Sequence, residues 1–458
     1  MCGISGFCNL HTDFLEREPY YRNILSDMSD ALYHRGPDSH GIYLTSHTGF
    51  SHTRLAIIDP HGGLQPMTRH YCDADFTIVY NGELYNTKEL REELVSHGMT
   101  FRTHSDTEVI LKGFLFEGPS FVRKMNGIFA FAIYDEAHQL LYLFRDAFGV
   151  KPLFYRLFHD TLIFSSEPKG IFCYPGCIPS VNKTGLCEIF GLGPARNPGN
   201  AVYEHMAECL PGHYLTFSAS RLKDYCYFRL ESHPHTDSYE ETVVHTKELL
   251  LQSIRRQMVS DVPICTFLSG GIDSSLVSSV CAGELKKEGR QLKTFSFDFT
   301  DNENYFQSNS FQPSMDKPYA AKMASYLNSH HTYLECTNQT QADYLLRSVK
   351  AHDLPCMADI DSSLLYFCEQ VSHTHKVVLT GECADEVFGG YPWYHREEIL
   401  FEDTFPWSRS VGLRLGLLTP DAVRNGEEFV RQHYRDTCAR APRLPSDDKK
   451  GGGDTPLQ

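Results

Sequence analysis

The stretch VPICTFLSGGIDSS, residues 262–275, decides the fold of the second half of this chain. Its apolar beginning predicts a strand over 262–268, and the sequence after it predicts a helix over 274–285. Between them, Gly270 and Gly271 let backbone N–H groups turn inward, and the start of a helix favours negative charge. The stretch therefore predicts a phosphate-binding loop. It is neither a Walker A loop, which needs a lysine, nor a GxGxxG dinucleotide loop.

The alternation of strand, loop and helix continues after this loop. We predict a strand over 292–299, a helix over 317–327, and another strand over 376–380 that runs into a second glycine-rich loop. Such alternation is typical of an open parallel sheet wrapped by helices, which binds ligands beyond the carboxyl ends of its strands.

The first half has a different rhythm, with short strands and few helices. Residues 76–80 form an apolar run that we expect to end at Asn81-Gly82, and residues 105–108 (Ser-x-x-Glu) predict the capped start of a helix. Residues 127–134 and 140–144 predict a hairpin. Because these strands are apolar on both faces, we expect their sheet to be covered on both sides.

A chain of 458 residues is too long for one ordinary core. We therefore predict an N-terminal domain over 2–218, a polar linker over 219–240, a second domain over 241–443, and an unstructured tail over 444–458.

Composition excludes several classes of protein. With 41% hydrophobic and 22% charged residues and no long apolar run, the chain is typical of a soluble globular protein without membrane spans. Its net charge of -16 argues against nucleic acid as a partner. The opening residues lack a secretion signal, so we expect a cytoplasmic protein whose 15 cysteines are mostly buried free thiols.

The second residue is a candidate nucleophile. Cys2 is followed by glycine, and its small side chain permits removal of Met1, which would leave a thiol and a free amine on one residue. Their reference pKa values, about 8.5 and about 7.7–8.0, both lie near working pH. The amine could assist the thiol in attacking an amide carbonyl, which gives a thioester and releases ammonia. Taken alone, a cysteine at position 2 is more often there by chance than as a nucleophile.

The motifs that accompany Cys2 argue against a chance cysteine. They are MCGISGF (1–7), HRGPD (34–38), RLAII (54–58), NGELYN (81–86), SDTE (105–108), GIFAF (127–131) and RD (145–146). Together they resemble the class II glutamine amidotransferases over the whole first half. The resemblance implies an N-terminal-nucleophile (Ntn) αββα sandwich, α+β in class, with two sheets between helices.

The resemblance implies a glutamine site whose chemistry is sensible residue by residue. Arg54 would bind the substrate carboxylate through two parallel hydrogen bonds, and Asp106 its ammonium. The side chain of Asn81 and the backbone N–H of Gly82 would form the oxyanion hole. Without the resemblance, Arg54 and Asp106 would be interpreted as solvated surface charges. The remaining glutamine-binding residues implied are Leu55, Ile58 and Glu83.

The second half carries two further resemblances. SGGIDSS, residues 269–275, is the signature of the ATP pyrophosphatases, in which the loop aspartate, here Asp273, helps to hold Mg²⁺ against pyrophosphate. TGECADEVFGG, residues 380–390, resembles a segment of the asparagine synthetases. It implies that Glu382 serves an aspartyl-adenylate step and that Asp385 binds the metal. The implied ATP-binding residues are Leu268, Ser269, Gly270, Gly271, Asp273, Ser274, Phe297, Thr380 and Gly381.

Two residues of the 380–390 segment depart from the family pattern. Thr380 stands where serine is usual, and it keeps the hydroxyl. Cys383 stands where glycine is usual and puts a side chain where the backbone needs freedom. The acidic cluster has a simpler interpretation as a helix start favoured by the helix dipole. Residues 314–319 and 357–363 also resemble the family and are expected to line the same cleft.

The whole chain resembles a bacterial-type glutamine-hydrolysing asparagine synthetase. The resemblance implies that ATP and aspartate form β-aspartyl-AMP, that ammonia released at Cys2 crosses a mostly apolar passage to it, and that asparagine, glutamate, AMP and pyrophosphate result. Glutamine, aspartate and ATP are then the small-molecule partners, with Mg²⁺ as cofactor and a homodimer as in many family members.

The family usually continues with a helical segment after the position where this sequence ends. We therefore expect a truncated second domain and impaired asparagine formation. Three alternatives stay open: a glutaminase whose synthetase half is inactive, a ligase that amidates another carboxylic acid, and a non-enzymatic binding protein, against which the intact Cys2 speaks.

Overall fold

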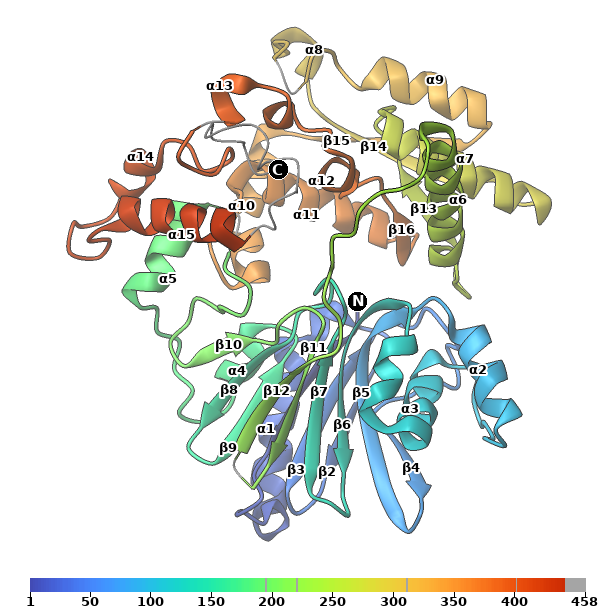
Figure 1. The fold of residues 1–458 in the computed structure, drawn as a ribbon, viewed down its shortest axis with the longest axis vertical. Coiled ribbons are helices and arrows are strands. Elements are labelled where there is room, and N and C mark those ends of the chain that lie inside the picture. The colour runs from blue at the N-terminus through green and yellow to red at the C-terminus, as the bar shows by residue number, and fades with distance from the viewer. Residues whose placement is uncertain (194–195, 220, 310–311, 401, 441–458) are drawn as a thin grey trace. The chain divides into compact units, whose positions relative to one another are not determined.

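The computed structural model contains two compact units, and each is described by itself (Figure 1). The first unit comprises Met1–Gly185 and Asn197–Glu231, and the second comprises Leu186–Arg196 and Ser232–Gln458. The structure describes residues 1–193, 196–219, 221–309, 312–400 and 402–440. The predicted tail, 444–458, and the predicted end of the second domain at residue 443 lie outside these residues.

The first unit is built on two six-stranded antiparallel sheets (Figure 1). The first sheet has the order β10-β8-β9-β1-β3-β2, with bounds β1 Gly3–Cys8, β2 Ser39–Leu44, β3 Thr48–Arg54, β8 Phe154–Phe158, β9 Thr161–Ser165 and β10 Met206–Glu208. The second has the order β12-β11-β7-β6-β5-β4, with bounds β4 Met67–Tyr71, β5 Ala74–Leu84, β6 Gly127–Asp135, β7 Leu140–Arg145, β11 His213–Ser218 and β12 Arg221–Cys226.

Helices cover the outer face of each sheet. Helix α1 (Glu18–Ala31) packs on the first sheet with α4 (Pro168–Phe172), and α3 (Asp106–Glu117) packs on the second with α2 (Thr87–Ser96) beside it. Short helical segments complete the connections: η1 Phe14–Arg17, η2 Tyr33–Arg35, η3 Gly118–Lys124 and α5 Lys183–Cys187. The layers therefore run helix, sheet, sheet, helix, which confirms the predicted αββα sandwich.

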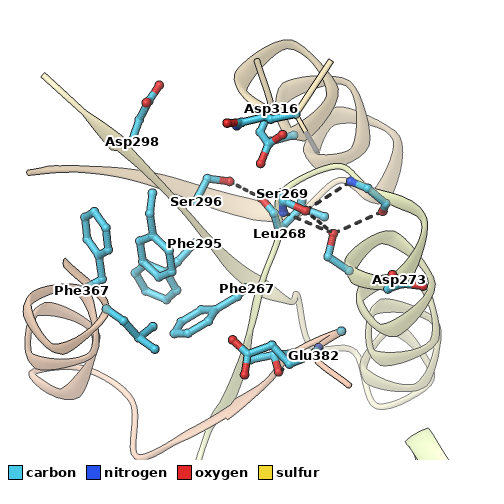
Figure 2. Close-up of a pocket in the computed structure, with 18 of the residues that line it drawn as sticks. Phe267, Leu268, Ser269, Asp273, Phe295, Ser296, Asp298, Asp316, Phe367 and Glu382 are labelled. Carbon is cyan, nitrogen blue, oxygen red and sulfur yellow. Dashed lines mark hydrogen bonds between the residues drawn. The ribbon is translucent and has the colours of Figure 1, made fainter. Parts of the chain in front are cut away.

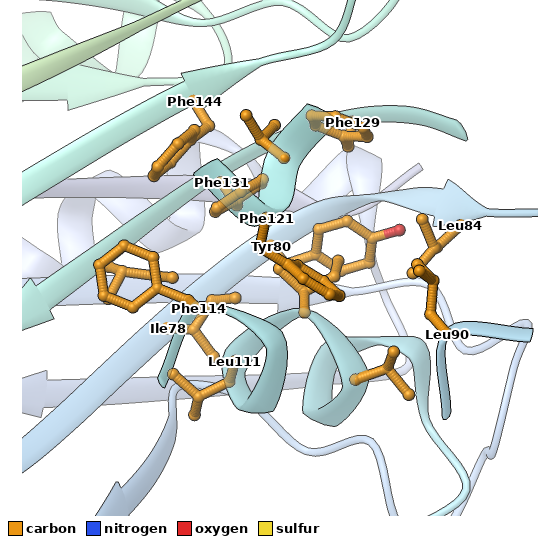
Figure 3. Close-up of a cluster of buried hydrophobic side chains, with 14 of the residues drawn as sticks. Ile78, Tyr80, Leu84, Leu90, Leu111, Phe114, Phe121, Phe129, Phe131 and Phe144 are labelled. Carbon is orange, nitrogen blue, oxygen red and sulfur yellow. The ribbon is translucent and has the colours of Figure 1, made fainter. Parts of the chain in front are cut away.

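Three apolar cores hold these four layers together. Under α2 and α3, the second sheet packs a cluster that includes Phe114, Phe131 and Phe144, whose last two rings stack at 4.5 Å (Figure 3). A second cluster fills the space between the sheets, and a third lies between the first sheet and α1. Both sheets are thus covered on both faces, as the apolar strands predicted.

Local sequence signals explain the start of α3 and the hairpin. The Ser105 hydroxyl accepts from the Glu108 backbone N–H at 3.3 Å, so Ser105 is the N-cap as predicted. The Glu108 side chain does not close a reciprocal box; it accepts instead from Arg69 at 2.8 Å. Strands β6 and β7 pair as the predicted hairpin.

The predicted break at Asn81-Gly82 is wrong. Strand β5 continues through both residues to Leu84, and β6 pairs with it along its whole length from Phe76 onward. A Cβ at position 82 would clash with the backbone carbonyl of Ile128 on β6. Gly82 therefore serves close approach of two strands rather than a turn.

The second unit holds a four-stranded parallel sheet in the order β15-β14-β13-β16. Its strands are β13 Ile264–Phe267, β14 Lys293–Phe299, β15 His330–Cys336 and β16 Val377–Leu379. Its longer helices are α6 Tyr239–Gln257, α7 Ile272–Lys287, α9 Lys317–Leu327, α10 Asn338–His352, α11 Ala358–Ser372 and α15 Gly426–Arg440. The shorter ones are η4 Glu188–Leu192, α8 Asn302–Tyr305, α12 Ala384–Phe388, η5 Pro392–Tyr394, α13 Glu397–Leu400 and α14 Val411–Leu415.

The helices wrap the parallel sheet in two groups. Helices α6, α7 and α9 pack together, and α10 packs against α11 (Figure 1). This confirms the predicted α/β unit, and the α9 bounds match the predicted helix. The predicted linker, 219–240, contains β12, which extends the second sheet of the first unit, and ends at the start of α6.

Two predictions from composition can be compared with the structure. All 15 cysteines are free thiols, as predicted, but only seven of them are buried, so the prediction that most are buried is wrong. Among the residues that the structure describes, no helix combines the length and the apolar character needed to cross a membrane.

Candidate active sites

Cys2 lies just before β1 and is fixed by two neighbours. Its sulfur accepts from the Leu55 backbone N–H at 3.4 Å and lies 3.7 Å from the Leu55 carbonyl oxygen. Its own carbonyl accepts from Arg35 Nε at 2.9 Å, and Arg35 also forms a 2.6 Å ion pair with Glu167. A buried ion pair therefore anchors the backbone of the candidate nucleophile.

The surroundings of Cys2 disfavour charge on the chain terminus. Burial lowers the pKa of the Met1 amine to about 5, and the cations Arg35 and Lys151 add to the effect. Burial also raises the pKa of the Cys2 thiol. This amine belongs to Met1, whereas the predicted base is the Cys2 amine, which becomes free only when Met1 is removed.

Asn81 is the most unusual polar side chain of the first unit. It lies on β5 with 1% of its surface exposed, and neither its amide oxygen nor its amide nitrogen has a hydrogen-bond partner among the described residues. Buried polar groups are nearly always paired, so this amide beside Gly82 is an exception to the general rule. The arrangement fits the predicted oxyanion hole.

Arg54 and Asp106 are buried, with 5% and 6% exposure, so their interpretation as solvated surface charges is wrong. Arg54 donates to the carbonyls of Ile58 at 3.3 Å, Asp59 at 2.7 Å and Pro60 at 2.8 Å, and thereby shapes the loop after β3.

Asp106 accepts from the Tyr80 hydroxyl at 2.9 Å and from the backbone N–H of Thr107 at 2.9 Å. Burial raises the pKa of Asp106, and burial together with Asp106 raises the pKa of Glu83 to about 8. Both carboxyl groups also bear on the electrostatics of Cys2, so the structure brings these predicted residues to one place.

Sequence reasoning missed Lys151. Its side chain is 6% exposed, and its ammonium lies 3.0 Å from the sulfur of Met1. Burial lowers the pKa of Lys151, while Glu83 and Cys2 raise it. Asp146, from the quoted Arg-Asp motif, accepts from the Lys151 backbone N–H at 2.9 Å and so shapes its loop. The feature of the sequence that could have identified Lys151 is its position five residues after Asp146.

The second unit has a pocket of about 880 Å³ at the carboxyl ends of its strands (Figure 2). This is where an open parallel sheet was predicted to bind ligands. The pocket is lined by eight predicted ATP-binding residues, with Gly270 outside the lining: Leu268, Ser269, Gly271, Asp273, Ser274, Phe297, Thr380 and Gly381. It also contains Glu382 and Asp385.

Hydrogen bonds of two serine hydroxyls fix the loop after β13. The hydroxyls of Ser269 and Ser274 lie 3.0 Å apart, and Gly271 N donates to Ser269 at 3.3 Å. Gly270 has a φ of +88°, and a Cβ there would clash with the backbone at Tyr319. Only glycine fits this position, so Gly270 shapes the predicted phosphate loop from behind.

One wall of the pocket is aromatic. Phe297 stacks on Phe367 with centroids 4.2 Å apart and meets Phe267 edge-on at 4.6 Å. Flat apolar faces of this kind suit a planar base. The pocket therefore offers a surface for a ring at one side and a glycine-rich loop at the other.

Two carboxylates of the pocket lie close enough to affect each other. Burial and the nearby Asp385 raise the pKa of Asp273. Like charges at close range are relieved by a cation, and carboxylate oxygens are ligands that Mg²⁺ prefers. The donor set therefore fits the predicted metal. Asp385 also lies in the first turn of α12, so the helix-start interpretation of the acidic cluster holds alongside its place in the pocket.

Cys383 occupies the left-handed region, with φ of +71° and ψ of 1°. This conformation strains any residue with a Cβ, as its departure from glycine predicted. Of the further segments expected at the cleft, Asp316 and Lys317 from 314–319 and Ser363 from 357–363 line the pocket. Asp298, near the end of β14, also lines it and was missed, because a single aspartate in a strand has no distinctive pattern.

Comparisons with known proteins match both halves. The glutamine amidotransferase domain family matches residues 1–228, and the asparagine synthase family matches residues 245–457. Asparagine synthetase [glutamine-hydrolyzing] 3 of Bacillus subtilis is 43% identical over 97% of this chain and 72% of its own length. Synthetase 1 of Bacillus subtilis is 32% identical over 93% and 64%, and synthetase 3 of Arabidopsis thaliana is 30% identical over 86% and 62%.

Proposed function

This chain belongs to the glutamine-hydrolysing asparagine synthetase family, and we propose that it converts aspartate to asparagine with ammonia taken from glutamine. ATP would be cleaved to AMP and pyrophosphate, and glutamate would be the second amino-acid product. The observation that carries the proposal is that one chain holds both parts. One unit holds the half-buried Cys2 thiol and the buried Asn81 amide, which has no hydrogen-bond partner among the described residues, and the other holds a nucleotide-sized pocket.

In the first unit, the reaction would begin once Met1 is removed. The Cys2 amine takes the thiol proton, and the sulfur attacks the glutamine carboxamide to form a thioester as ammonia leaves. The Asn81 amide and the Gly82 N–H stabilise the oxyanion. Arg54 binds the glutamine carboxylate and Asp106 its ammonium, while Leu55, Ile58 and Glu83 line the site. Water then hydrolyses the thioester to glutamate.

In the second unit, the pocket would orient ATP against aspartate. The adenine lies against Phe297, and the loop at Ser269 and Gly270 donates hydrogen bonds to pyrophosphate. Mg²⁺, when bound, neutralises the leaving pyrophosphate, and Asp273 and Asp385 would hold it. The nucleotide contacts of the proposal also include Leu268, Gly271, Ser274, Thr380 and Gly381. Glu382 serves the adenylate step.

The proposal includes three features at the level of the whole protein. Ammonia needs a mostly apolar passage to the adenylate, because ammonia in water would be protonated and lost. Free cysteines fit a cytoplasmic location, since that compartment keeps thiols reduced. The protein would form a homodimer, as many members of the family do.

The test measures asparagine, glutamate and pyrophosphate from the purified chain with glutamine, aspartate, ATP and Mg²⁺. We expect all three products, and we expect Cys2→Ala to abolish glutamine-dependent but not ammonia-dependent synthesis. Glutamate without pyrophosphate would identify a glutaminase instead. ATP–pyrophosphate exchange with another acid, but not with aspartate, would identify a ligase for a different acceptor. Undiminished glutamate release by Cys2→Ala would contradict the assignment of Cys2 as the nucleophile.

A further inference from the structure

The ends of two packed helices in the second unit bring together three metal-binding side chains outside the nucleotide pocket. His352 is the last residue of α10, Asp361 lies in the first turn of α11, and Cys356 lies in the short connection between them. One ligand atom from each lies within 4.8 Å of the other two. Across the described residues, no other group of three His, Cys, Asp or Glu side chains meets this geometry.

We propose that His352, Cys356 and Asp361 form a binding site for a thiophilic divalent cation of the Zn²⁺ type. None of the three lines the nucleotide pocket, so the site is separate from the proposed Mg²⁺ position.

The spacing of the three side chains is close to that of a metal site. Ligands of tetrahedral zinc lie about 3.3–3.7 Å apart, since the metal is about 2.3 Å from sulfur and about 2.0 Å from nitrogen. The observed limit of 4.8 Å therefore needs an inward shift of roughly 1 Å, within reach of side-chain rotation. His352 is 53% exposed, which leaves a fourth position for water.

The donor set selects the class of metal. A thiolate with an imidazole and one carboxylate suits zinc and similar ions, whereas Mg²⁺ and Ca²⁺ prefer oxygen ligands alone. Cys356 and Asp361 would carry two negative charges against one cation, with His352 neutral as a ligand. The site is therefore suited to a dication.

Two simpler explanations of the cluster are incomplete. Asp361 accepts from the Met357 backbone N–H at 2.5 Å and so helps to start α11, but this uses one oxygen, and the other lies 3.8 Å from His352 Nε2. A redox or nucleophilic role for the thiol would need a lowered pKa. Burial and Asp361 instead raise the pKa of Cys356 to about 11.

A metal here would fix the start of α11 to the end of α10. Helix α11 carries Ser363, Leu364 and Phe367, which line the nucleotide pocket. The site is thus placed to steady one wall of that pocket without touching what it binds.

The test measures Zn²⁺ affinity by competition with a chromophoric chelator, and Co²⁺ binding by its thiolate-to-metal absorption. The full chain carries Cys2→Ala throughout, because a terminal thiol and amine also chelate metals. Cys356→Ser and His352→Ala are compared with Cys368→Ser, a matched control, since Cys368 is an exposed thiol on the same helix α11.

We expect one Zn²⁺ per chain, at least about tenfold weaker binding in Cys356→Ser and His352→Ala, and no change in Cys368→Ser. The cobalt–thiolate band should vanish in Cys356→Ser. Absence of stoichiometric binding by the parent, or parental affinity in either cluster variant, overturns the site. If Cys356→Ser fails to fold, His352→Ala decides alone, because an exposed side chain can be removed without disturbing the core.

Discussion

Asn81→Ala tests whether the orphaned amide on β5 is kept for catalysis. Its side chain has no internal hydrogen bond to lose among the described residues. Removing one donor from an oxyanion hole costs about 10²–10³ in kcat, or about 2.7–4 kcal/mol. We expect the glutaminase kcat to fall by this factor with KM little changed, because the bond strengthens only in the transition state.

The same substitution should leave stability intact. An unsatisfied buried polar group costs about 1–3 kcal/mol, so losing the amide offsets the small void that alanine leaves. Asn86 is the matched control, because its amide donates to the Lys124 carbonyl at 2.9 Å and accepts from Asn126 N–H at 2.9 Å. Asn86→Ala should lower the free energy of unfolding by about 1–2 kcal/mol and keep kcat.

The assays are glutamate release at saturating glutamine, urea unfolding, and ammonia-dependent asparagine synthesis as a control for the second unit. A kcat for Asn81→Ala within tenfold of the parent, with normal folding, contradicts the oxyanion role. A loss of more than about 2 kcal/mol in unfolding free energy would show that the amide is structural.

Three further predictions concern charge and strain. Because the proposed mechanism uses the Cys2 amine as free base, kcat/KM for glutamine hydrolysis should fall with decreasing pH only below the ordinary amine pKa of about 7.7–8.0. Lys151→Met should move that limb to higher pH, because it removes a buried cation whose charge interacts with Cys2. A pH profile that the substitution leaves unchanged contradicts this. Cys383→Gly should raise the free energy of unfolding, measured in urea, by about 0.5–1 kcal/mol, because φ at this position is +71°. An unchanged free energy of unfolding would contradict the prediction that the backbone at Cys383 is strained. Asp273→Asn should slow aspartate-dependent ATP–pyrophosphate exchange at least about tenfold and leave glutamate release unchanged. An exchange rate equal to that of the parent would exclude Asp273 as a metal ligand.

Local signals determined much of the fold and so were readable from sequence. The apolar runs of the parallel sheet, the Ser105 cap and the β6–β7 hairpin depend on neighbours along the chain. Lys151 was missed because its importance comes from its charge close to Glu83 and Cys2, which are far from it along the chain. The cluster at His352 was missed because its members converge only when α10 and α11 pack.

The strand end that differs most from its prediction concerns a pair of residues that also belong to the proposed site. Asn-Gly is among the strongest turn signals in a sequence, because both residues tolerate left-handed backbone. In β5 that preference is overridden: Gly82 allows β6 to approach, and Asn81 is buried with no hydrogen-bond partner among the residues that the structure describes. Neither residue suits an ordinary strand, because glycine weakens a strand and an unpaired buried amide costs free energy. Local preference and native structure disagree most where residues are selected for what they bind, so this conflict is itself an argument for function at Asn81 and Gly82.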